Sequence, residues 1–460
     1  MARLLRGAIA ALVLTLVAVG CGNASDSATP TTVAGKSDTS VPANGGAAQR
    51  DVHHPITGVP GVSDDKIDFA VVGTKTNNPL GICILDCYLD GVKAYFSYRN
   101  SQGGIYGRKL TVGSVTDDQL ANNKKVDLGI VSDGKAFGTF QASLLPQGWG
   151  DLNDAGVPTY TWGIDAQSAA NREAVFPSTV IQCADCTRRI QPFVAMKVGA
   201  KKAAVLGYSA SATSQQCANS VADSFGKYAK ETGVQQVYLK DNLPYGLPNG
   251  LGPEVTAMKK AGVDFIATCF DLNAMKTLAQ ALKRAGMRDS VTLYHSDSYN
   301  QEAVSKVGGL FDGDFVEVQF RPFEADPSGS ALGTFEKWMA RQKSSVNELA
   351  MVGWINASLA YDGLLAAGPD FDRAKVVAAT NALKGWTADG LVPAADWAQS
   401  HGTFTQATRT KFDSPECGTV VRVGKGGTFT LPDFENPKKP WLCWPGTDLA
   451  WSAPVDTSFG

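Results

Sequence analysis

The amino-acid sequence predicts an α/β fold with mostly parallel sheets, and three observations support this class. Short continuous apolar runs, such as Ile67–Val72, Ala203–Gly207 and Val263–Thr268, indicate strands that are buried on both faces. Segments whose apolar residues are spaced by three and four positions separate these runs and indicate amphipathic helices. The 460 residues, 44% of them hydrophobic, are enough for two or three such domains.

Residues 1–20 have the composition of a secretory signal peptide. Arg3 and Arg6 begin the segment, and the uncharged run Gly7–Gly20 is too short to span a bilayer comfortably as a helix. The run closes with Ala-Val-Gly before Cys21, which resembles a bacterial lipobox, in which the cysteine becomes the lipid-modified N-terminus. Simple cleavage beside an incidental cysteine is the alternative.

Residues 21–63 are expected to form a disordered tether. The stretch Gly22–Arg50 is rich in Ser, Thr, Ala, Gly, Pro and Asn and offers almost no apolar surface to bury. No later segment has about 18 uninterrupted apolar residues, so a second membrane span is not expected. The sequence therefore predicts a protein held to the outer side of the cell membrane by the lipid on Cys21.

Strands and helices then alternate along the chain. A strand at Ile67–Val72 precedes a helix over residues 85–96 and a strand at Lys109–Val115, and Asp127–Val131 is expected to be a further strand, followed by the loop Phe137–Ser143. From Cys183 onward the alternation is clearer, with strands at Ala203–Gly207, Val234–Leu239, Val263–Thr268 and Val291–Tyr294. Ligands of open parallel sheets bind outside the carboxyl ends of the strands, so function is expected in the loops that follow strands.

The cysteines support export. Eight follow Cys21, and an even number in an exported chain suggests disulfides. Zinc or redox chemistry is the rival interpretation, because Cys183-Ala-Asp-Cys186 has redox spacing. With four histidines and no second C-x-x-C motif, the sequence favours structural disulfides and gives no metal site. Proximity along the chain suggests four pairs: Cys83–Cys87, Cys183–Cys186, Cys417–Cys443 and Cys217–Cys269.

Charge and motifs exclude several other functions. Lys and Arg total 42 against 44 Asp and Glu, so the chain has no general attraction to nucleic acid. Neither G-x-S-x-G nor a Walker loop occurs, and Ser224-Phe-Gly-Lys227 fits S-x-x-K only within a helical pattern. His295 could pair with Asp297 or Asp271, but no activated nucleophile is identifiable. Neither an enzyme nor a cofactor is expected.

Three stretches together resemble the type 1 periplasmic binding proteins, specifically the receptors for branched-chain amino acids. The first is Gly91–Leu110, with an Asn-x-x-Gly-Gly-x-x-Gly-Arg turn, followed by Asp117-Asp118. The second is Ala155-Gly-Val-Pro158, and the third is Gly353–Ala367, which contains a Tyr-Asp pair. The resemblance covers roughly residues 66–429.

This resemblance implies two doubly wound lobes, joined by a three-segment hinge, with a ligand enclosed between them. By analogy, lobe one takes residues 64–180 plus 297–403, and lobe two takes residues 181–296 plus 404–460. The implied function is the capture of a small ligand, an amino acid or related compound, and its delivery to the permease of an ABC importer. A lipoprotein that senses a ligand and signals to a membrane partner is the alternative.

The resemblance also implies which residues of lobe one face the ligand. The segment Phe137–Ser143 resembles the family's serine-rich loop, where hydroxyl and backbone N–H groups receive the ligand's carboxylate. Thr139 is the expected hydroxyl, with Ser143 at a helical start. Thr161 and Trp162, which follow the second stretch, would add a hydroxyl and an aromatic wall.

Lobe two contributes Tyr208, Phe270 and Asp271, and the segment His295–Tyr299 at the boundary between the lobes adds Asp297 and Tyr299. Asp297 matches the family's acidic position that pairs with a ligand ammonium, a charge-assisted contact that is stronger than a neutral one. The aromatic residues around the expected cleft favour a ligand that is larger, flatter or less charged than leucine. The ligand is therefore expected to be amino-acid-like or aromatic.

Overall fold

The computed structural model describes residues 51–164, 166–179, 186–209, 212–397, 401, 416–444 and 449–459. The predicted signal peptide, Cys21 and most of the predicted tether lie outside this range. The end of the tether, residues 51–63, is instead part of the fold. The Asp68 N–H donates to the Gly61 carbonyl at 2.8 Å, and the Arg108 guanidinium donates to the carbonyls of His54 and Ser63. These hydrogen bonds fasten the segment to the first sheet, so the prediction was wrong for these residues.

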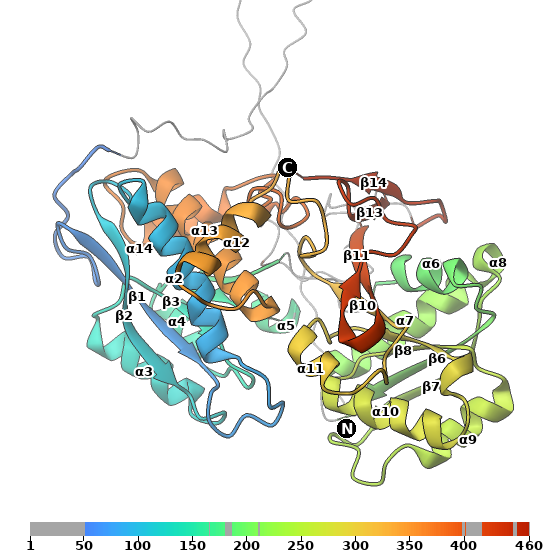
Figure 1. The fold of residues 1–460 in the computed structure, drawn as a ribbon. Coiled ribbons are helices and arrows are strands. Elements are labelled where there is room, and N and C mark those ends of the chain that lie inside the picture. Colours follow the sequence, from blue (N-terminus) through green and yellow to red (C-terminus); the bar gives the residue numbers. More distant parts are fainter. Residues whose placement is uncertain are drawn as a thin grey trace, which may run out of the picture. The chain divides into compact units, whose positions relative to one another are not determined.

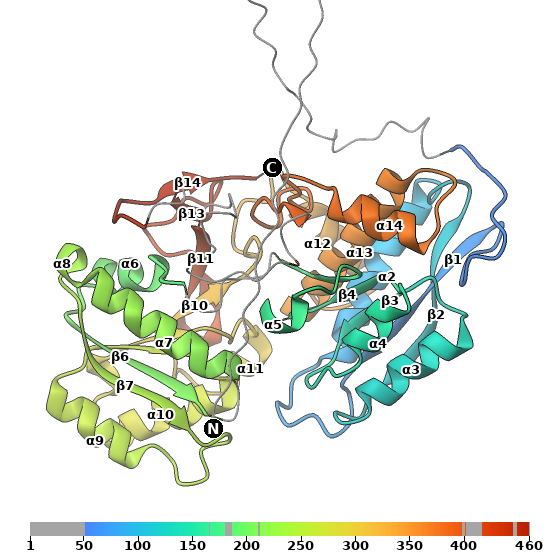
Figure 2. The ribbon, with the colours of Figure 1, turned by 180° about the vertical axis from the view of Figure 1, so that it is seen from behind.

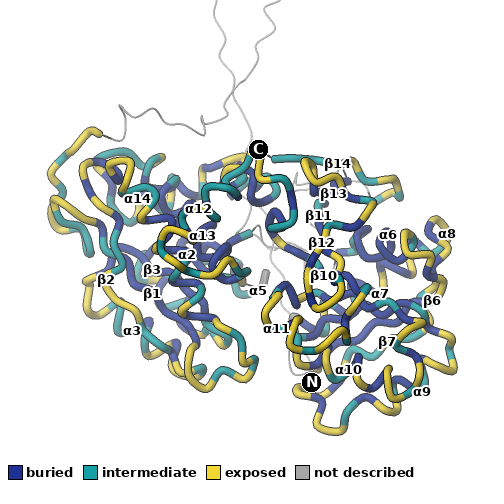
Figure 3. Tube along the Cα trace, in the orientation of Figure 1, coloured by how far each residue is buried: buried dark blue, intermediate teal, exposed yellow. Residues whose placement is uncertain are grey.

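The first sheet has five parallel strands in the order β2-β1-β3-β4-β5. Figure 1 labels β1, β2 and β3 of this sheet. The central strands are buried because helices cover them (Figure 3). The strands of this sheet are β1 (Lys66–Gly73), β2 (Lys109–Asp117), β3 (Gly138–Ala142), β4 (Thr159–Thr161) and β5 (Val175–Pro177).

Helices α2 (Leu85–Ser101) and α13 (Glu348–Ala367) pack closely although they are far apart in the sequence (Figures 1 and 2). Glycines make this approach possible. A Cβ atom on Gly91 would lie 1.8 Å from the Ala350 carbonyl oxygen, and one on Gly353 would lie 2.1 Å from the Tyr88 carbonyl oxygen. Helix α13 is long and apolar enough to cross a membrane, but 83% of its apolar window is buried in the protein, so it is a core helix.

The predicted strand Asp127–Val131 is wrong. These residues lie in helix α3 (Asn123–Asp133), which ends at Gly134 in a left-handed conformation. Apolar and polar residues alternate here as in a strand, yet Leu128 is 45% exposed whereas Asp127 is fully buried. A buried carboxylate, bonded to a strand side chain, sets the face of this helix, and hydrophobic periodicity does not register such a contact.

The second sheet joins a parallel part to an antiparallel extension, in the order β14-β13-β11-β10-β9-β8-β6-β7. The parallel strands are β6 (Lys202–Tyr208), β7 (Gln235–Leu243), β8 (Phe265–Thr268), β9 (Thr292–His295) and β10 (Phe315–Val318). The antiparallel strands are β11 (Glu416–Val423), β12 (Phe429–Thr430), β13 (Trp441–Trp444) and β14 (Val455–Thr457).

Strand β10 belongs to the second sheet, although the predicted boundary assigns its residues to lobe one. It pairs with β9 on one side and with β11 on the other, so it belongs to the second sheet. The predicted boundary assigns residues 297–403 to lobe one, and the sheet pairing differs from this for residues 315–318. A four-residue strand carries too few residues for periodicity to show which sheet it joins.

The remaining helices connect the strands and cover the sheets (Figure 2). Helix α7, for example, packs against β6 and β7. These helices are α4 (Trp149–Asp154), α5 (Ala166–Ala169), α6 (Ile190–Lys197), α7 (Ala212–Lys227), α8 (Ala229–Thr232), α9 (Gly252–Ala261), α10 (Leu272–Arg284), η1 (Arg288–Ser290), α11 (Gln301–Ser305), α12 (Leu332–Arg341), α14 (Arg373–Asn381) and η4 (Lys425–Gly427).

Three predicted disulfides are confirmed: Cys83–Cys87, Cys217–Cys269 and Cys417–Cys443. Cys186 is also disulfide-bonded, while its predicted partner Cys183 lies outside the described residues. The Cys417–Cys443 bond joins β11 to β13 and so fastens the C-terminal strands to the second sheet.

A buried ion pair holds this C-terminal extension against α6. The Arg189 guanidinium donates to Glu416 at 3.0 Å, and the two side chains are 1% and 4% exposed. The backbone N–H of Arg189 donates to the same carboxylate. Glu416 therefore satisfies both a buried cation and the start of a helix.

The substitution Glu416→Ala is expected to lower the free energy of unfolding by about 3–5 kcal/mol, because it leaves a buried cation without its carboxylate. Urea denaturation followed by circular dichroism measures this loss. Glu302→Ala, which removes an ion pair whose side chains are 70% and 80% exposed, is the control and should leave the midpoint unchanged. Equal midpoints for the two variants would contradict the role of the buried pair.

Candidate functional site

Three of the predicted ligand residues meet at the carboxyl edge of the second sheet. Tyr208 ends β6, and Phe270 and Asp271 follow β8, the neighbouring strand. The Tyr208 hydroxyl donates to Asp271 Oδ2 at 2.8 Å, and the Tyr208 and Phe270 ring centroids are 4.7 Å apart. The structure brings these three together because parallel strands present their carboxyl ends at one edge.

Asp271 also begins helix α10. Its Oδ1 accepts hydrogen bonds from the backbone N–H groups of Asn273 at 2.9 Å and Ala274 at 3.2 Å, which makes it the N-cap. Both carboxylate oxygens thus have donors within the protein. With these bonds Asp271 orients the Tyr208 side chain and the first turn of α10.

Asp297 has a different environment. It follows β9 and is exposed to solvent, and among the described residues no hydrogen bond reaches its carboxylate. The protein around it nevertheless reduces its hydration, and this burial, together with the negative charge of Asp271, raises its pKa to about 6. A side chain that solvent reaches but dense protein surrounds is one that a small ligand could contact.

Two further residues of this region are not among the predicted ones. Glu348, at the start of α13, has a pKa raised well above its ordinary value by burial and by the charge of Asp297. Tyr245 is 52% exposed, and its ring centroid lies 5.3 Å from that of Tyr208. Tyr245 follows β7, so the rule that loops after strands carry function would have found it. Glu348 comes from a distant helix, and no sequence signal links it to Asp297.

Tyr299 belongs to the packed interior. It is 4% exposed, and its hydroxyl donates to Glu324 at 2.7 Å and accepts from the Phe323 N–H at 2.9 Å. Its ring centroid lies 5.0 Å from that of Phe429 and 5.3 Å from that of Phe323. These contacts give it a structural role, and they offer no support for the ligand contact predicted from its neighbourhood to Asp297.

His295 does not form the pairs considered from the sequence. Its Nδ1 lies 3.1 Å from Ser298 Oγ and its Nε2 lies 3.3 Å from Asp314 Oδ2. The same Asp314 oxygen accepts from Arg288 at 2.5 Å. The buried histidine is thus part of a structural network beneath the loop that carries Asp297.

The predicted residues of the first sheet lie in two places. Thr139 is within strand β3, fully buried, and its hydroxyl accepts from Gln141 at 3.3 Å. The segment expected to be a loop is a strand, so Thr139 sits inside the sheet and not at its carboxyl edge. Ser143 follows β3 and accepts from Asn123 at 3.1 Å, whereas Thr161 and Trp162 stand at the end of β4.

The Gln141 side chain extends this buried network to helix α3. It donates to Asp127 at 2.7 Å and accepts from Asn123 at 3.1 Å. Burial raises the pKa of Asp127 to about 7. Thr139 therefore belongs to the polar core that fixes α3 on the sheet, which explains its burial without a ligand.

One hydrogen bond connects the loop after β1 to the edge of the second sheet. The Asn273 side-chain amide, in the first turn of α10, donates to the Pro79 carbonyl at 3.3 Å. The loop that carries Pro79 ends at the Cys83–Cys87 disulfide. Asn273 is two residues from Asp271, so this hydrogen bond lies near the Tyr208–Asp271 pair.

Metal binding has no support within the part of the chain that the structure describes. No group of three or more His, Cys, Asp or Glu side chains there could hold a metal ion. The charge of Asp271 raises the pKa of Asp297, and the charge of Asp297 raises that of Glu348, but the three side chains do not form such a group.

Comparison with known proteins identifies the family. A family described as "Periplasmic binding protein" matches residues 84–427. The chain belongs to the periplasmic binding protein family. Members of this family are receptors that bind solutes, so this binding protein is not an enzyme. No curated protein matches the sequence.

Solved structures of solute receptors share the fold of this periplasmic binding protein. A solute-binding protein of an ABC transporter from R. palustris, in complex with 4-hydroxybenzoate, is 16% identical with a TM-score of 0.64, over 84% of this chain and 98% of that one. A fatty acid ABC transporter substrate-binding protein from Thermomonospora curvata is 15% identical, with a TM-score of 0.60 over 87% and 97%.

A branched-chain amino acid ABC transporter protein from Thermus thermophilus, with bound valine, is 16% identical, with a TM-score of 0.59 over 80% of this chain and 95% of that one. At these identities the likeness shows the fold, which is that of the type 1 periplasmic binding proteins. The fold predicted from the sequence is confirmed. The ligands in these titles differ, so the fold does not choose among them.

Proposed function

We propose that this periplasmic binding protein captures a small ligand with a protonated amine and delivers it to an ABC importer. The structural relatives named above are ABC transporter proteins, which supports the importer as the partner. The amine follows from the site, because the relatives bind acids as well as an amino acid. Lipid attachment through Cys21 would hold the receptor beside its permease.

The environment of Asp297 carries this proposal. Its carboxylate is open to solvent, has no hydrogen-bond donor among the described residues, and has its pKa raised by the negative charge of Asp271. Its pKa shift has no contribution from a cationic side chain. A ligand ammonium would relieve the mutual repulsion of these carboxylates and supply the missing donor.

Aromatic side chains at the same edge suit such a cation. The Tyr208 ring centroid lies 5.3 Å from that of Tyr245 and 4.7 Å from that of Phe270. A cation within about 6 Å of an aromatic face is attracted by its quadrupole. These rings would also contact the apolar part of an amino acid or aromatic amine. Ser143, Thr161 and Trp162, at the carboxyl edge of the first sheet, would contact the other end of the ligand.

The mechanism follows from differential affinity. A ligand that contacts residues of both sheets stabilises the closed form only through contacts that the open form lacks. The Asn273–Pro79 hydrogen bond is one contact between the two parts that does not need the ligand. The closed form would then be the one that the permease recognises.

A thermal-shift panel tests the proposal. Aliphatic and aromatic amino acids and aromatic amines should include a compound that raises the unfolding midpoint by several degrees, because ligand at a hundred times its Kd adds about 2.7 kcal/mol. The best compound should bind Asp297→Asn at least about tenfold more weakly by titration calorimetry. Asp289→Asn, an exposed aspartate before the opposite end of β9, is the matched control. If only uncharged or acidic compounds stabilised the protein, the proposal that its ligand has a protonated amine would be contradicted.

Ligand affinity should also depend on pH. Below its pKa of about 6 the Asp297 carboxyl is protonated and offers an ammonium no charge. Affinity for a cation should therefore rise about tenfold from pH 5 to pH 7 and then level off, since the ionised fraction rises from about a tenth to nine tenths. Calorimetry across this range measures the change. An unchanged affinity, or one that falls as the pH rises, would contradict pairing with Asp297.

A further inference from the structure

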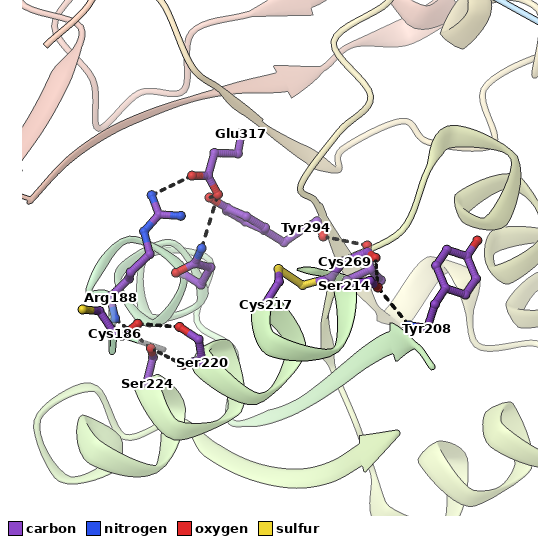
Figure 4. Close-up of a disulfide and its surroundings, with 12 residues drawn as sticks. Cys186, Arg188, Tyr208, Ser214, Cys217, Ser220, Ser224, Cys269, Tyr294 and Glu317 are labelled. Carbon is purple, nitrogen blue, oxygen red and sulfur yellow. Dashed lines mark hydrogen bonds and ion pairs between the residues drawn. A yellow bond between two sulfur atoms is a disulfide. The ribbon is translucent and has the colours of Figure 1, made fainter. Parts of the chain in front are cut away.

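Beneath the ligand-facing residues lies a cross-link between strand β8 and helix α7 (Figure 4). The disulfide Cys217–Cys269 joins the middle of α7 to the residue that directly follows β8. Phe270 and Asp271 come next in the chain. The disulfide therefore fixes the start of the turn that carries two of the candidate ligand residues.

Ser214 makes a second link at the same place. Its hydroxyl donates to the Cys269 carbonyl at 2.7 Å and accepts from the Tyr208 N–H at 2.9 Å. One buried side chain thus bonds the ends of two neighbouring strands, β6 and β8. Both ends carry a residue of the Tyr208–Asp271 pair.

Close packing makes this arrangement rigid. A Cβ atom on Gly207 would lie 2.7 Å from the Ala218 Cβ and 2.9 Å from the Ser214 carbonyl oxygen. The missing side chain lets α7 approach the end of β6 and brings Ser214 within reach of Tyr208. Any side chain at position 207 would push the helix away from the strand.

We propose that Ser214 and the Cys217–Cys269 disulfide are positioning groups, which together hold Tyr208 and the Phe270–Asp271 turn in the geometry that a ligand meets. The inference deepens the proposed function, since it rests on this edge being the ligand-facing one. A disulfide stabilises a fold generally, according to the length of the loop that it closes. The Cys217–Cys269 disulfide would in addition position the residues beside it. The Ser214 hydroxyl holds the ends of β6 and β8 together, and the disulfide fixes α7, the helix that carries Ser214.

The same helix supplies a matched control. Ser224 is also buried on α7, where its hydroxyl accepts from the Arg188 N–H at 2.8 Å and donates to the Ser220 carbonyl at 2.6 Å (Figure 4). Ser214 and Ser224 thus make the same kinds of bond from the same helix. Only Ser214 reaches the candidate site, so alanine at each position separates positioning from stability.

The experiment compares Ser214→Ala with Ser224→Ala in the purified protein without ligand. Hydrogen exchange at the Tyr208 amide and in residues 269–271 should accelerate at least about tenfold in Ser214→Ala, because the amide loses its acceptor. Ser224→Ala should accelerate exchange near Arg188 instead. The two variants should lose similar thermal stability.

A spectroscopic readout follows the ring itself. In protein labelled with 3-fluorotyrosine, the resonance that Tyr208→Phe removes should shift or broaden in Ser214→Ala and stay unchanged in Ser224→Ala. Ser214→Thr, which keeps the hydroxyl, should restore the original resonance. A Tyr208 resonance and exchange pattern equal in both alanine variants would overturn the proposal.

The disulfide is tested in the same way. Cys217→Ala with Cys269→Ala should disturb the Tyr208 resonance, whereas Cys417→Ala with Cys443→Ala should not, although it removes a disulfide from the same sheet. These two double variants test the positioning role if Ser214→Ala does not fold. These readouts need no ligand, so the positioning role can fail while the amine-binding function stands, and the reverse.

Discussion

The parallel pairing of β6, β8 and β9 is the constraint on which the candidate site depends. These strands are buried on both faces, so their own residues are almost entirely apolar, and polar groups can appear only where the strands end. The pairing register then brings Tyr208, Asp271 and Asp297 to a common edge. Side chains that are separated in sequence by dozens of residues become neighbours because the backbone hydrogen bonds leave no other arrangement.

Crowding at this edge creates the chemistry. Asp271 accepts hydrogen bonds from Tyr208 and from the backbone at the start of α10, and its charge raises the pKa of Asp297. Asp297 has no such donors among the described residues. Nothing there offsets the burial and the charge of Asp271 that disfavour its ionised form. The two aspartates on adjacent loops therefore differ in their hydrogen bonds: Asp271 orders the protein around it, and Asp297 is the one for which we propose a ligand contact.

The second sheet could be predicted well from the sequence because its strands are continuous apolar runs. The first sheet was harder, and Asp127–Val131 shows why: a buried polar network through Gln141 turns an apparently alternating strand into a helix with a carboxylate on its inner face. That error displaced Thr139 from a loop into a strand. The predicted lobe boundary at residue 297 does not follow the pairing of β10 with β9 and β11, because a four-residue strand is too short for periodicity to show which sheet it joins.

Other parts of the site had no sequence signal at all. The charge of Asp297 raises the pKa of Glu348, which lies at the start of a helix far along the chain, and only the tertiary structure brings the two carboxyl groups together. The role of Ser214 likewise depends on the approach of α7 to Gly207. By contrast, Asp297 was predicted as a ligand residue from its place in a family pattern, and its ligand role stays a proposal.

The ionisation of Asp297 without ligand tests the account most directly. Carbon-13 NMR of aspartate-labelled protein, with the Asp297 resonance assigned by Asp297→Asn, gives the pKa of this carboxyl. We expect a value of about 6, set by reduced hydration and the charge of Asp271. A value near the ordinary aspartate pKa of about 3.9 would show a carboxylate already stabilised by solvent or by a donor, and would contradict the claim that this site awaits a cation.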